Sequence, residues 1–224
     1  MNVTLCLTHD CNLRCAYCYA GLKQGRHMTW ETAKRAINFA FEHTVARARL
    51  MGKTPEAQLG YFGGEPLLEW DLLTRSSAYA DEEAARLGLG LKKTVTTNMT
   101  LLDVAKIDWL RENAFKEGYA ACDKCGFGLD EVAVAASGNL YPCERIVGDD
   151  TNTELCLGTV FDGFDGAQRR LFFMRNAIRP SSRSFMAPWR PPHAEHFPEC
   201  RRIGLRLNRY SGAKMKNGVV VVIP

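Results

Sequence analysis

The 224-residue chain has no apolar run that approaches the ~20 residues needed for a membrane-spanning helix. Residues 1–7 contain no basic region, no long apolar stretch and no small-residue cleavage site, so a secretory signal is not expected. The formal net charge is only +4, which by itself does not indicate a nucleic-acid partner. These absences predict a cytoplasmic protein with no membrane partner.

Cysteine, by contrast, is abundant, with nine residues in the chain. They are Cys6, Cys11, Cys15, Cys18, Cys122, Cys125, Cys143, Cys156 and Cys200. In a reducing compartment, clustered cysteines indicate metal or redox chemistry more than disulfide bonds. The odd number also fits poorly with a fully paired disulfide framework.

The first half of the chain alternates strand and helix patterns. Strands are expected at 2–7, 57–62 and 91–97, and helices at 30–49, 70–87 and 103–113. Apolar residues from Ala33 to Phe41 recur at the spacing of one helical face. The β-α-β-α-β-α order predicts an α/β fold with a parallel sheet and right-handed crossovers. Ligands bind at the carboxyl edge of such sheets, so the loops after the strands are the candidate site.

The pattern changes after residue 115. Residues 132–136 and 139–143 indicate a hairpin that turns at Ser137-Gly138. The stretch 175–210 holds eight arginines and five prolines without any period, so no regular structure is expected there. The last apolar residues, 219–223, are predicted to form either a strand or an unpaired tail.

Three cysteines follow the first strand in a C-x3-C-x2-C pattern, at Cys11, Cys15 and Cys18. Thiolates are soft ligands that suit iron–sulfur clusters. Three thiolates on one tight loop would leave one iron of a four-iron cluster open to chelate a substrate or cofactor. A zinc site with His9 as fourth ligand and a set of unrelated buried cysteines are the alternatives that these residues leave open.

The loop after the second strand reads Gly63-Gly64-Glu65-Pro66. Glycines free the backbone to approach a ligand closely, and the Glu65 carboxylate can accept hydrogen bonds from an ammonium group. Pro66 fixes the turn into the next segment. Taken alone, the four residues also suit an ordinary strand-to-helix turn.

Together these motifs resemble those of the radical SAM superfamily. The resemblance implies that Cys11, Cys15 and Cys18 bind a [4Fe–4S] cluster whose open iron is chelated by S-adenosylmethionine. An electron from the cluster would break the S–C5′ bond, and the 5′-deoxyadenosyl radical would abstract a substrate hydrogen. The protein would position these cofactors and exclude water. A reducing electron donor of the flavodoxin or ferredoxin type is implied as a partner.

The resemblance also implies that residues of three loops bind S-adenosylmethionine. They are Tyr17, Gly63, Gly64, Glu65, Pro66, Thr97 and Asn98. Tyr17 would lie near the adenine, with a packing role as its alternative. The Gly-Gly-Glu-Pro loop matches the family's motif for the methionyl amino group. Thr97 and Asn98 resemble part of the family's Thr-Asn-Gly motif, which lies near the ribose and the methionyl carboxylate. Met99 stands in place of the motif's glycine. The alternative is that Thr97 and Asn98 only form a turn.

The spacing C-x12-G-x4-C from Cys125 to Cys143 resembles the opening of the SPASM extension. It implies that Cys122, Cys125 and Cys143 are ligands of one auxiliary [4Fe–4S] cluster, with a zinc site or free thiols as the alternative. Cys156 and Cys200 do not keep the spacing of a second auxiliary cluster.

The resemblance implies a partial radical SAM (β/α) barrel of about three βα units at 1–115. A small SPASM-like region follows at 116–175, and an irregular basic tail at 176–224. Three further βα units of the family are missing between the first two parts, which suggests an internal deletion. A sheet of three strands is expected to leave an open edge and an apolar face.

The SPASM-like ligands predict modification of a peptide or protein substrate, for example by thioether or carbon–carbon crosslinking. Glu144 resembles the proton-accepting acid of sulfatase-maturing relatives, so formylglycine formation with Glu144 as general base is an alternative function. The alternative role for Glu144 itself is that of a solvated surface charge. The missing strands favour a third alternative, a remnant that binds cluster and cofactor without turnover. Nucleic-acid binding by the arginine-rich tail is disfavoured, because its arginines lack helical spacing.

Overall fold

The computed structural model describes residues 1–15, 18, 23–113, 115, 131–177 and 220–221. The chain divides into two compact units, Met1–Arg169 with Asn217–Pro224, and Arg170–Lys216. Of the second unit, the described residues comprise only the end of one helix. Tyr17, Cys122 and Cys125 lie outside the described residues, as does nearly all of the predicted tail.

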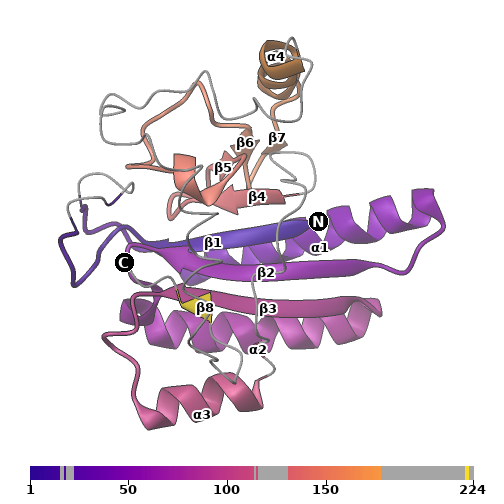
Figure 1. Ribbon diagram of the computed structural model, residues 1–224. Helices are drawn as coiled ribbons and strands as arrows, with labels where there is room; N and C mark the ends of the chain where they lie inside the picture. Colours follow the sequence, from indigo (N-terminus) through magenta and orange to yellow (C-terminus); the bar gives the residue numbers. More distant parts are fainter. Residues whose placement is uncertain (16–17, 19–22, 114, 116–130, 178–219, 222–224) are drawn as a thin grey trace, which may run out of the picture. The chain divides into compact units, whose positions relative to one another are not determined.

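The three predicted βα units are confirmed, and their bounds lie close to the predicted ones (Figure 1). They are β1 (Asn2–Thr8), α1 (Trp30–Met51), β2 (Glu56–Gly63), α2 (Trp70–Leu87), β3 (Gly90–Thr97) and α3 (Val104–Glu112), with a 3-10 turn, η1 (Pro66–Glu69), before α2. Both β1–β2 and β2–β3 pair in parallel. The carboxyl ends of the three strands therefore meet at one edge of the sheet.

Local signals set the helix ends. The Thr29 hydroxyl accepts a hydrogen bond from the Thr32 amide at 3.1 Å and caps α1. The Asp103 carboxylate accepts one from the Lys106 amide at 2.8 Å and caps α3. Gly88 ends α2 in the left-handed conformation, at φ 61°, which glycine adopts without steric cost. These ends fix where each chain segment returns to the sheet.

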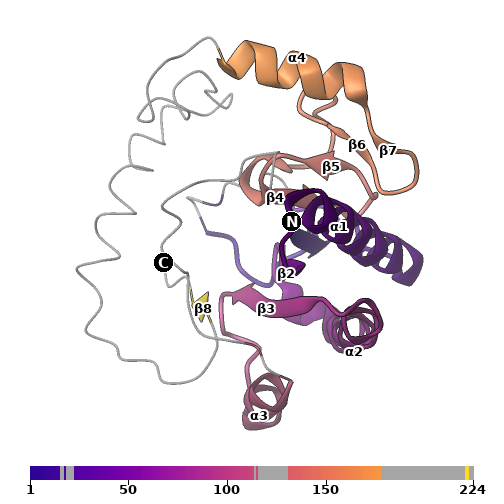
Figure 2. The same cartoon turned by 90° about the vertical axis from the view of Figure 1, so that its right-hand side faces the viewer.

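One face of the sheet packs against α1 and α2, which lie on the same side in Figure 2. Leu5, Leu59 and Val95 point to this face and are fully buried. Burying each such side chain contributes about 1.5–3 kcal/mol, so this layer is the main core of the first unit.

The opposite face is mixed. Near the carboxyl edge Cys6 belongs to a small buried apolar cluster, against which Phe62 packs, so the predicted apolar face is present there; the rest of the face is polar. Thr4, Gly60 and Thr94 form one row across the three strands. A Cβ on Gly60 would lie 3.1 Å from the Thr4 hydroxyl and 3.5 Å from that of Thr94. Gln58 and Lys92 form the next row. Along these two rows the strands alternate apolar and polar residues, so the helix-covered face is buried and the polar rows of the other face stay compatible with water.

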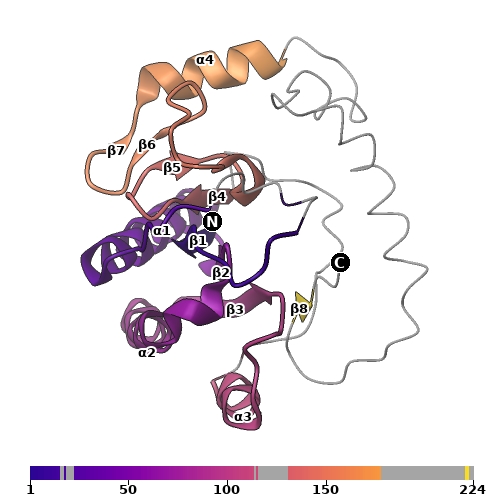
Figure 3. The ribbon, with the colours of Figure 1, turned by 90° about the vertical axis from the view of Figure 1, so that its left-hand side faces the viewer.

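The predicted hairpin is confirmed as β4 (Glu131–Val134) and β5 (Leu140–Tyr141), which pair antiparallel. β4 also pairs in parallel with the free edge of β1, and β8 (Val220–Val221) pairs with the end of β3. The strand order is β5-β4-β1-β2-β3-β8, and among the described residues the sheet stays open rather than closing into a barrel (Figure 3). The fold is thus α/β with a partial radical SAM-like core.

Besides η1, four elements after the hairpin were not predicted. They are η2 (Glu144–Ile146), β6 (Gly158–Thr159), β7 (Gly163–Phe164) and α4 (Gly166–Ala177). β6 and β7 form a separate two-stranded sheet, and the Phe164 ring lies 5.1 Å from that of Phe39 on α1. No helix among the described residues is long and apolar enough to cross a membrane.

Candidate functional site

The cysteine loop leaves the carboxyl end of β1. Cys11, Cys15 and Cys18 are free, half-buried thiols. The Leu13 amide donates to Cys11 Sγ at 3.4 Å, and the Cys18 amide donates to the Cys15 carbonyl at 3.1 Å. The loop therefore turns back on itself within a few residues and points a backbone N–H at a cysteine sulfur.

The two glycines after β2 are required by the entry to this loop. The Gly64 amide donates to the Thr8 carbonyl and the Glu65 amide to the Asp10 carbonyl, both at 2.8 Å. A Cβ on Gly63, whose φ is 141°, would lie 2.4 Å from the Thr8 oxygen, and one on Gly64 would lie 2.0 Å from the Asp10 oxygen. The sequence predicted that these glycines let the backbone approach a ligand. In the structure they let it approach the backbone of Thr8 and Asp10.

The Glu65 carboxylate is fully buried and joins the loops that follow β2 and β3. Its Oε1 accepts hydrogen bonds from the Leu67 amide at 2.9 Å and the Thr97 hydroxyl at 2.7 Å, and its Oε2 accepts one from the Asn98 amide at 2.8 Å. A carboxylate has about four acceptor positions, and the described residues use three of them. Pro66 opens η1, where its missing N–H costs nothing.

Asn98 continues this network to the cysteine loop. Its Nδ2 donates to Asn12 Oδ1 at 2.9 Å and to Cys11 Sγ at 3.6 Å. The Asn12 Nδ2 in turn donates to the Thr100 hydroxyl at 2.6 Å. Neither Asn12 nor Thr100 was identified from the sequence, because neither residue type is distinctive without its neighbours in space.

Met99 occupies the position where the resembling family has glycine, and its φ is 65°. Its amide donates to the Thr97 hydroxyl at 3.0 Å, which holds the turn. The loop therefore keeps the left-handed backbone that glycine favours, although the side chain makes it costly.

Lys23 is a third residue that was not identified from the sequence. Its Nζ donates to Cys18 Sγ at 2.9 Å. A lysine five residues after the third cysteine is indistinguishable in sequence from a solvated charge. Arg26, just beyond, donates to the Asp149 carbonyl at 3.2 Å and so ties the end of the loop to the region after the β4–β5 hairpin.

The donor set fits a four-iron cluster better than a single metal ion. Within the described residues no three His, Cys, Asp or Glu side chains converge as ligands of one ion, and the zinc site with His9 stays an alternative prediction. His9 is buried, neither ring nitrogen has a hydrogen-bond partner, and burial lowers its pKa. Each thiolate of a cluster binds a different iron, so three cysteine sulfurs need not meet at one point, and donors already lie beside those of Cys11 and Cys18.

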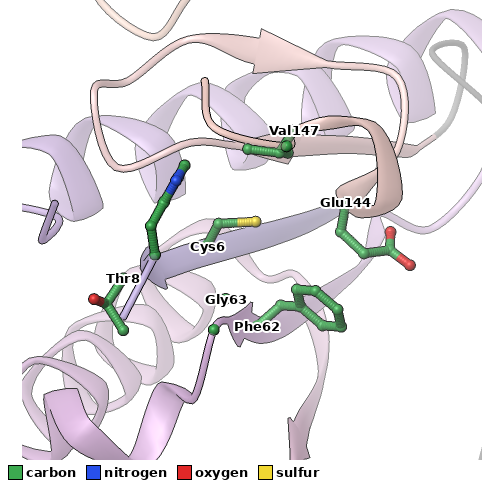
Figure 4. A pocket seen from close by; sticks show the side chains of 9 residues that line it. Cys6, Thr8, Phe62, Gly63, Glu144 and Val147 are labelled. Carbon is green, nitrogen blue, oxygen red and sulfur yellow. The ribbon is translucent and has the colours of Figure 1, made fainter. Parts of the chain in front are cut away.

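The predicted base Glu144 lies at the same edge of the sheet. It lines a small cavity with Cys6, His9 and Gly63-Gly64 (Figure 4). The cavity measures about 20 Å³, room for about one water molecule. Glu144 is therefore near the glycine loop, in a space too small for a cofactor.

Cys143, beside Glu144, has its sulfur 3.5 Å from Glu144 Oε2. Burial, followed by the Glu144 charge, raises the pKa of the Cys143 thiol well above its ordinary value. Its predicted partner ligands lie outside the described residues, so the auxiliary cluster stays a prediction.

Comparisons with known proteins agree with this arrangement. The family model described as "Radical SAM superfamily" matches residues 5–132. Native anSMEcpe with bound AdoMet has a similar structure, with a TM-score of 0.55, 12% identity, and coverage of 75% of this chain and 80% of that chain. Native anSMEcpe with bound AdoMet and Cp18Cys peptide gives the same score and identity, over 84% and 87% of the two chains. At this identity the likeness shows the fold.

A curated relative is the uncharacterized protein MJ0907 of Methanocaldococcus jannaschii, 28% identical over 117 residues. The match covers 52% of this chain and 37% of the relative, so the chain spans little more than a third of its length. The family match itself extends over more than half of this chain. The chain therefore belongs to the radical SAM superfamily, which implies a [4Fe–4S] cluster and S-adenosylmethionine as its cofactors.

Proposed function

We propose that this protein binds a [4Fe–4S] cluster through Cys11, Cys15 and Cys18 and cleaves S-adenosylmethionine to modify a peptide. The observation that carries the proposal is the hydrogen-bond path from the Glu65 carboxylate through Asn98 to Cys11 Sγ. This path links the loops after β1, β2 and β3, which are the three loops that carry the family's motifs. A site assembled from three loops by hydrogen bonds, buried at Glu65 and partly buried at Cys11, is preorganised for a ligand.

When bound, the cluster supplies the electron that breaks the sulfonium S–C5′ bond and yields a 5′-deoxyadenosyl radical. The chain's own residues hold and orient the two cofactors. The backbone of Gly63-Gly64 and the remaining acceptor position of Glu65 take the methionyl ammonium. Thr97 and Asn98 bind the ribose and the methionyl carboxylate, and the adenine is assigned to Tyr17, outside the described residues, by the family resemblance.

A peptide is the proposed substrate class for two reasons. The Cys125–Cys143 spacing resembles a module of peptide-modifying enzymes, and a similar solved structure, anSMEcpe, holds the Cp18Cys peptide. The polar face of the sheet, with Thr4 and Thr94 half-exposed, offers hydroxyl groups to a polar backbone. Thioether or carbon–carbon crosslinking is the proposed outcome, with Cys122, Cys125 and Cys143 holding one auxiliary cluster.

Two other functions have specific support. The sheet stays open among the described residues, which favours a protein that binds cluster and cofactor without turnover. Glu144 lies beside the glycine loop, which suits a base in formylglycine formation.

The three functions separate in one series of anaerobic experiments. Protein reconstituted with iron and sulfide, and reduced by dithionite or by a flavodoxin or ferredoxin, is mixed with S-adenosylmethionine. The proposal predicts 5′-deoxyadenosine together with a change in the electron paramagnetic resonance spectrum. A spectral change without 5′-deoxyadenosine would indicate binding without turnover, and the absence of both would overturn the proposal.

The substrate class is tested with peptides and mass spectrometry. A cysteine- or serine-containing peptide that gains formylglycine would favour the sulfatase-maturing alternative, whereas a crosslinked peptide would support the proposal. Iron content bears on the auxiliary cluster, since about eight irons per chain indicate two clusters and about four indicate one.

A further inference from the structure

The three cysteine sulfurs of the loop do not have equal surroundings. Cys11 Sγ accepts from neutral donors, the Leu13 amide at 3.4 Å and the Asn98 Nδ2 at 3.6 Å. Cys18 Sγ accepts from the Lys23 ammonium at 2.9 Å, a contact from a full positive charge. The loop therefore places its cation on one particular ligand sulfur.

This position differs from that of the other cation within the loop. Arg14 is exposed, and its guanidinium donates to the backbone carbonyls of Cys11 and Leu13 rather than to a sulfur. Lys23 is only half-exposed, so water screens its charge less than that of Arg14. Of these two cations, Lys23 alone is placed to act directly on a ligand.

A positive charge beside a ligand sulfur raises the electron affinity of the cluster that the sulfur would bind. Hydrogen bonds to the sulfurs, net charge and exposure set the reduction potential of an iron–sulfur cluster. One-electron reduction adds a negative charge, which the ammonium of Lys23 stabilises. The electron comes from the external reducing donor, and no bond in the chain forms or breaks.

We propose that Lys23, through its contact with Cys18 Sγ, raises the reduction potential of the cluster and so brings it within reach of the electron donor. This inference rests on the proposed cluster ligation by Cys11, Cys15 and Cys18. Lys23 is a positioning residue, since it acts through Cys18 and touches no substrate.

The test compares four full-length proteins. Lys23→Gln removes the charge and keeps a side chain of similar reach, and Lys23→Arg keeps the charge. Lys53→Gln is the matched control, because Lys53 is exposed and lines a shallow hollow with Met1 and Asn2, at the amino end of β1. Each protein is reconstituted anaerobically, its iron is counted, and its midpoint potential is measured by redox titration of the reduced cluster's paramagnetic resonance signal.

Lys23→Gln is expected to lower the equilibrium constant for reduction about tenfold, which is 59 mV for a one-electron couple. Lys23→Arg is expected to stay closer to wild type than Lys23→Gln, and Lys53→Gln to match wild type. The midpoint does not depend on occupancy, so the comparison holds even if a variant carries less iron. An unchanged potential in Lys23→Gln, or an equal fall in Lys53→Gln, would overturn the inference while leaving the cluster assignment intact. No iron in the wild type would instead overturn the proposed function and this inference together.

Discussion

Single residues in the site carry backbone strain that their neighbours compensate. Met99 holds a φ of 65°, which costs an ordinary L-residue about 1–2 kcal/mol. Its amide is fixed by the Thr97 hydroxyl, and Thr97 is fixed by the Glu65 carboxylate. The strain is therefore maintained by the same hydrogen bonds that join the loops.

Met99→Gly is expected to raise the free energy of unfolding by about 1 kcal/mol, because glycine adopts this φ without the steric cost. Urea denaturation measures the change. Met51→Gly is the matched control, since exposed Met51 ends a helix and glycine there should be destabilising. Destabilisation of similar size in both variants would show that the Met99 backbone is not strained.

Gly64→Ala is expected to cost about 3 kcal/mol or more, because its Cβ would lie 2.0 Å from the Asp10 carbonyl oxygen and neither backbone segment can yield easily. Gly25→Ala, with no atom within 4 Å of its Cβ, should stay within about 0.5 kcal/mol of wild type. Thermal or urea unfolding of both variants is the measurement. Equal stabilities would mean that the glycine loop does not pack on the entry to the cysteine loop.

At the scale of elements, the loops after β2 and β3 are joined through one buried carboxylate. Glu65→Gln replaces one acceptor oxygen by an NH2 group, which is a donor. In one orientation this group faces the Thr97 hydroxyl and the Leu67 amide, and in the other the Asn98 amide, so donor meets donor in both. The expected loss is about 1.5–3 kcal/mol of unfolding free energy, since these bonds are made to a charged group. Glu82→Gln, on the exposed face of α2, is the control and should be nearly neutral. A Glu65→Gln protein as stable as this control would contradict the network.

The contact between α1 and β7 is expected to depend on pH through His43. Its ring lies 4.4 Å from that of Phe39 and 5.4 Å from that of Phe164. Burial, and then the charge of Arg169, lower the pKa of His43 in the folded protein. The folded protein therefore favours the neutral ring, so this contribution to stability is present above the unfolded pKa of about 6.5 and is lost as the pH falls through the folded pKa.

Urea denaturation at neutral and at mildly acidic pH measures this dependence. Wild type is expected to lose more stability on acidification than His43→Gln, in which the titrating ring is absent. Because His43 is partly exposed, the difference should be modest. Equal losses in the two proteins would show that His43 does not titrate differently on folding.

Elements with repeated apolar spacing, or with a recognisable turn as in the β4–β5 hairpin, were predictable from the sequence, whereas η1, η2, β6, β7 and α4 were not. The three βα units and the β4–β5 hairpin have repeated apolar spacing and clear caps, such as Thr29 and Asp103. β6 and β7 are two residues each, too short for any period. The site's location followed from the carboxyl edge of the strands. Individual contacts such as Lys23 with Cys18 did not, because they depend on how two loops meet in space.

For the molecule as a whole, the position of β1 explains the composition of the site. β1 pairs in parallel with β2 on one side and with β4 on the other, so the cysteine loop leaves from inside the sheet rather than from its edge. The glycine loop lies to one side of it and η2 to the other. This is why Glu144, far away in the sequence, lines a cavity with Gly63-Gly64.

Ligation of one [4Fe–4S] cluster by Cys11, Cys15 and Cys18 is tested most directly by counting iron and acid-labile sulfide in anaerobically prepared protein. Wild type is expected to be brown with at least about four irons per chain. Replacing the three cysteines by alanine should remove about four of them, whereas Cys6→Ala, at a buried β1 position, should retain them. Colourless wild-type protein, or an undiminished iron count in the triple variant, would contradict the assignment.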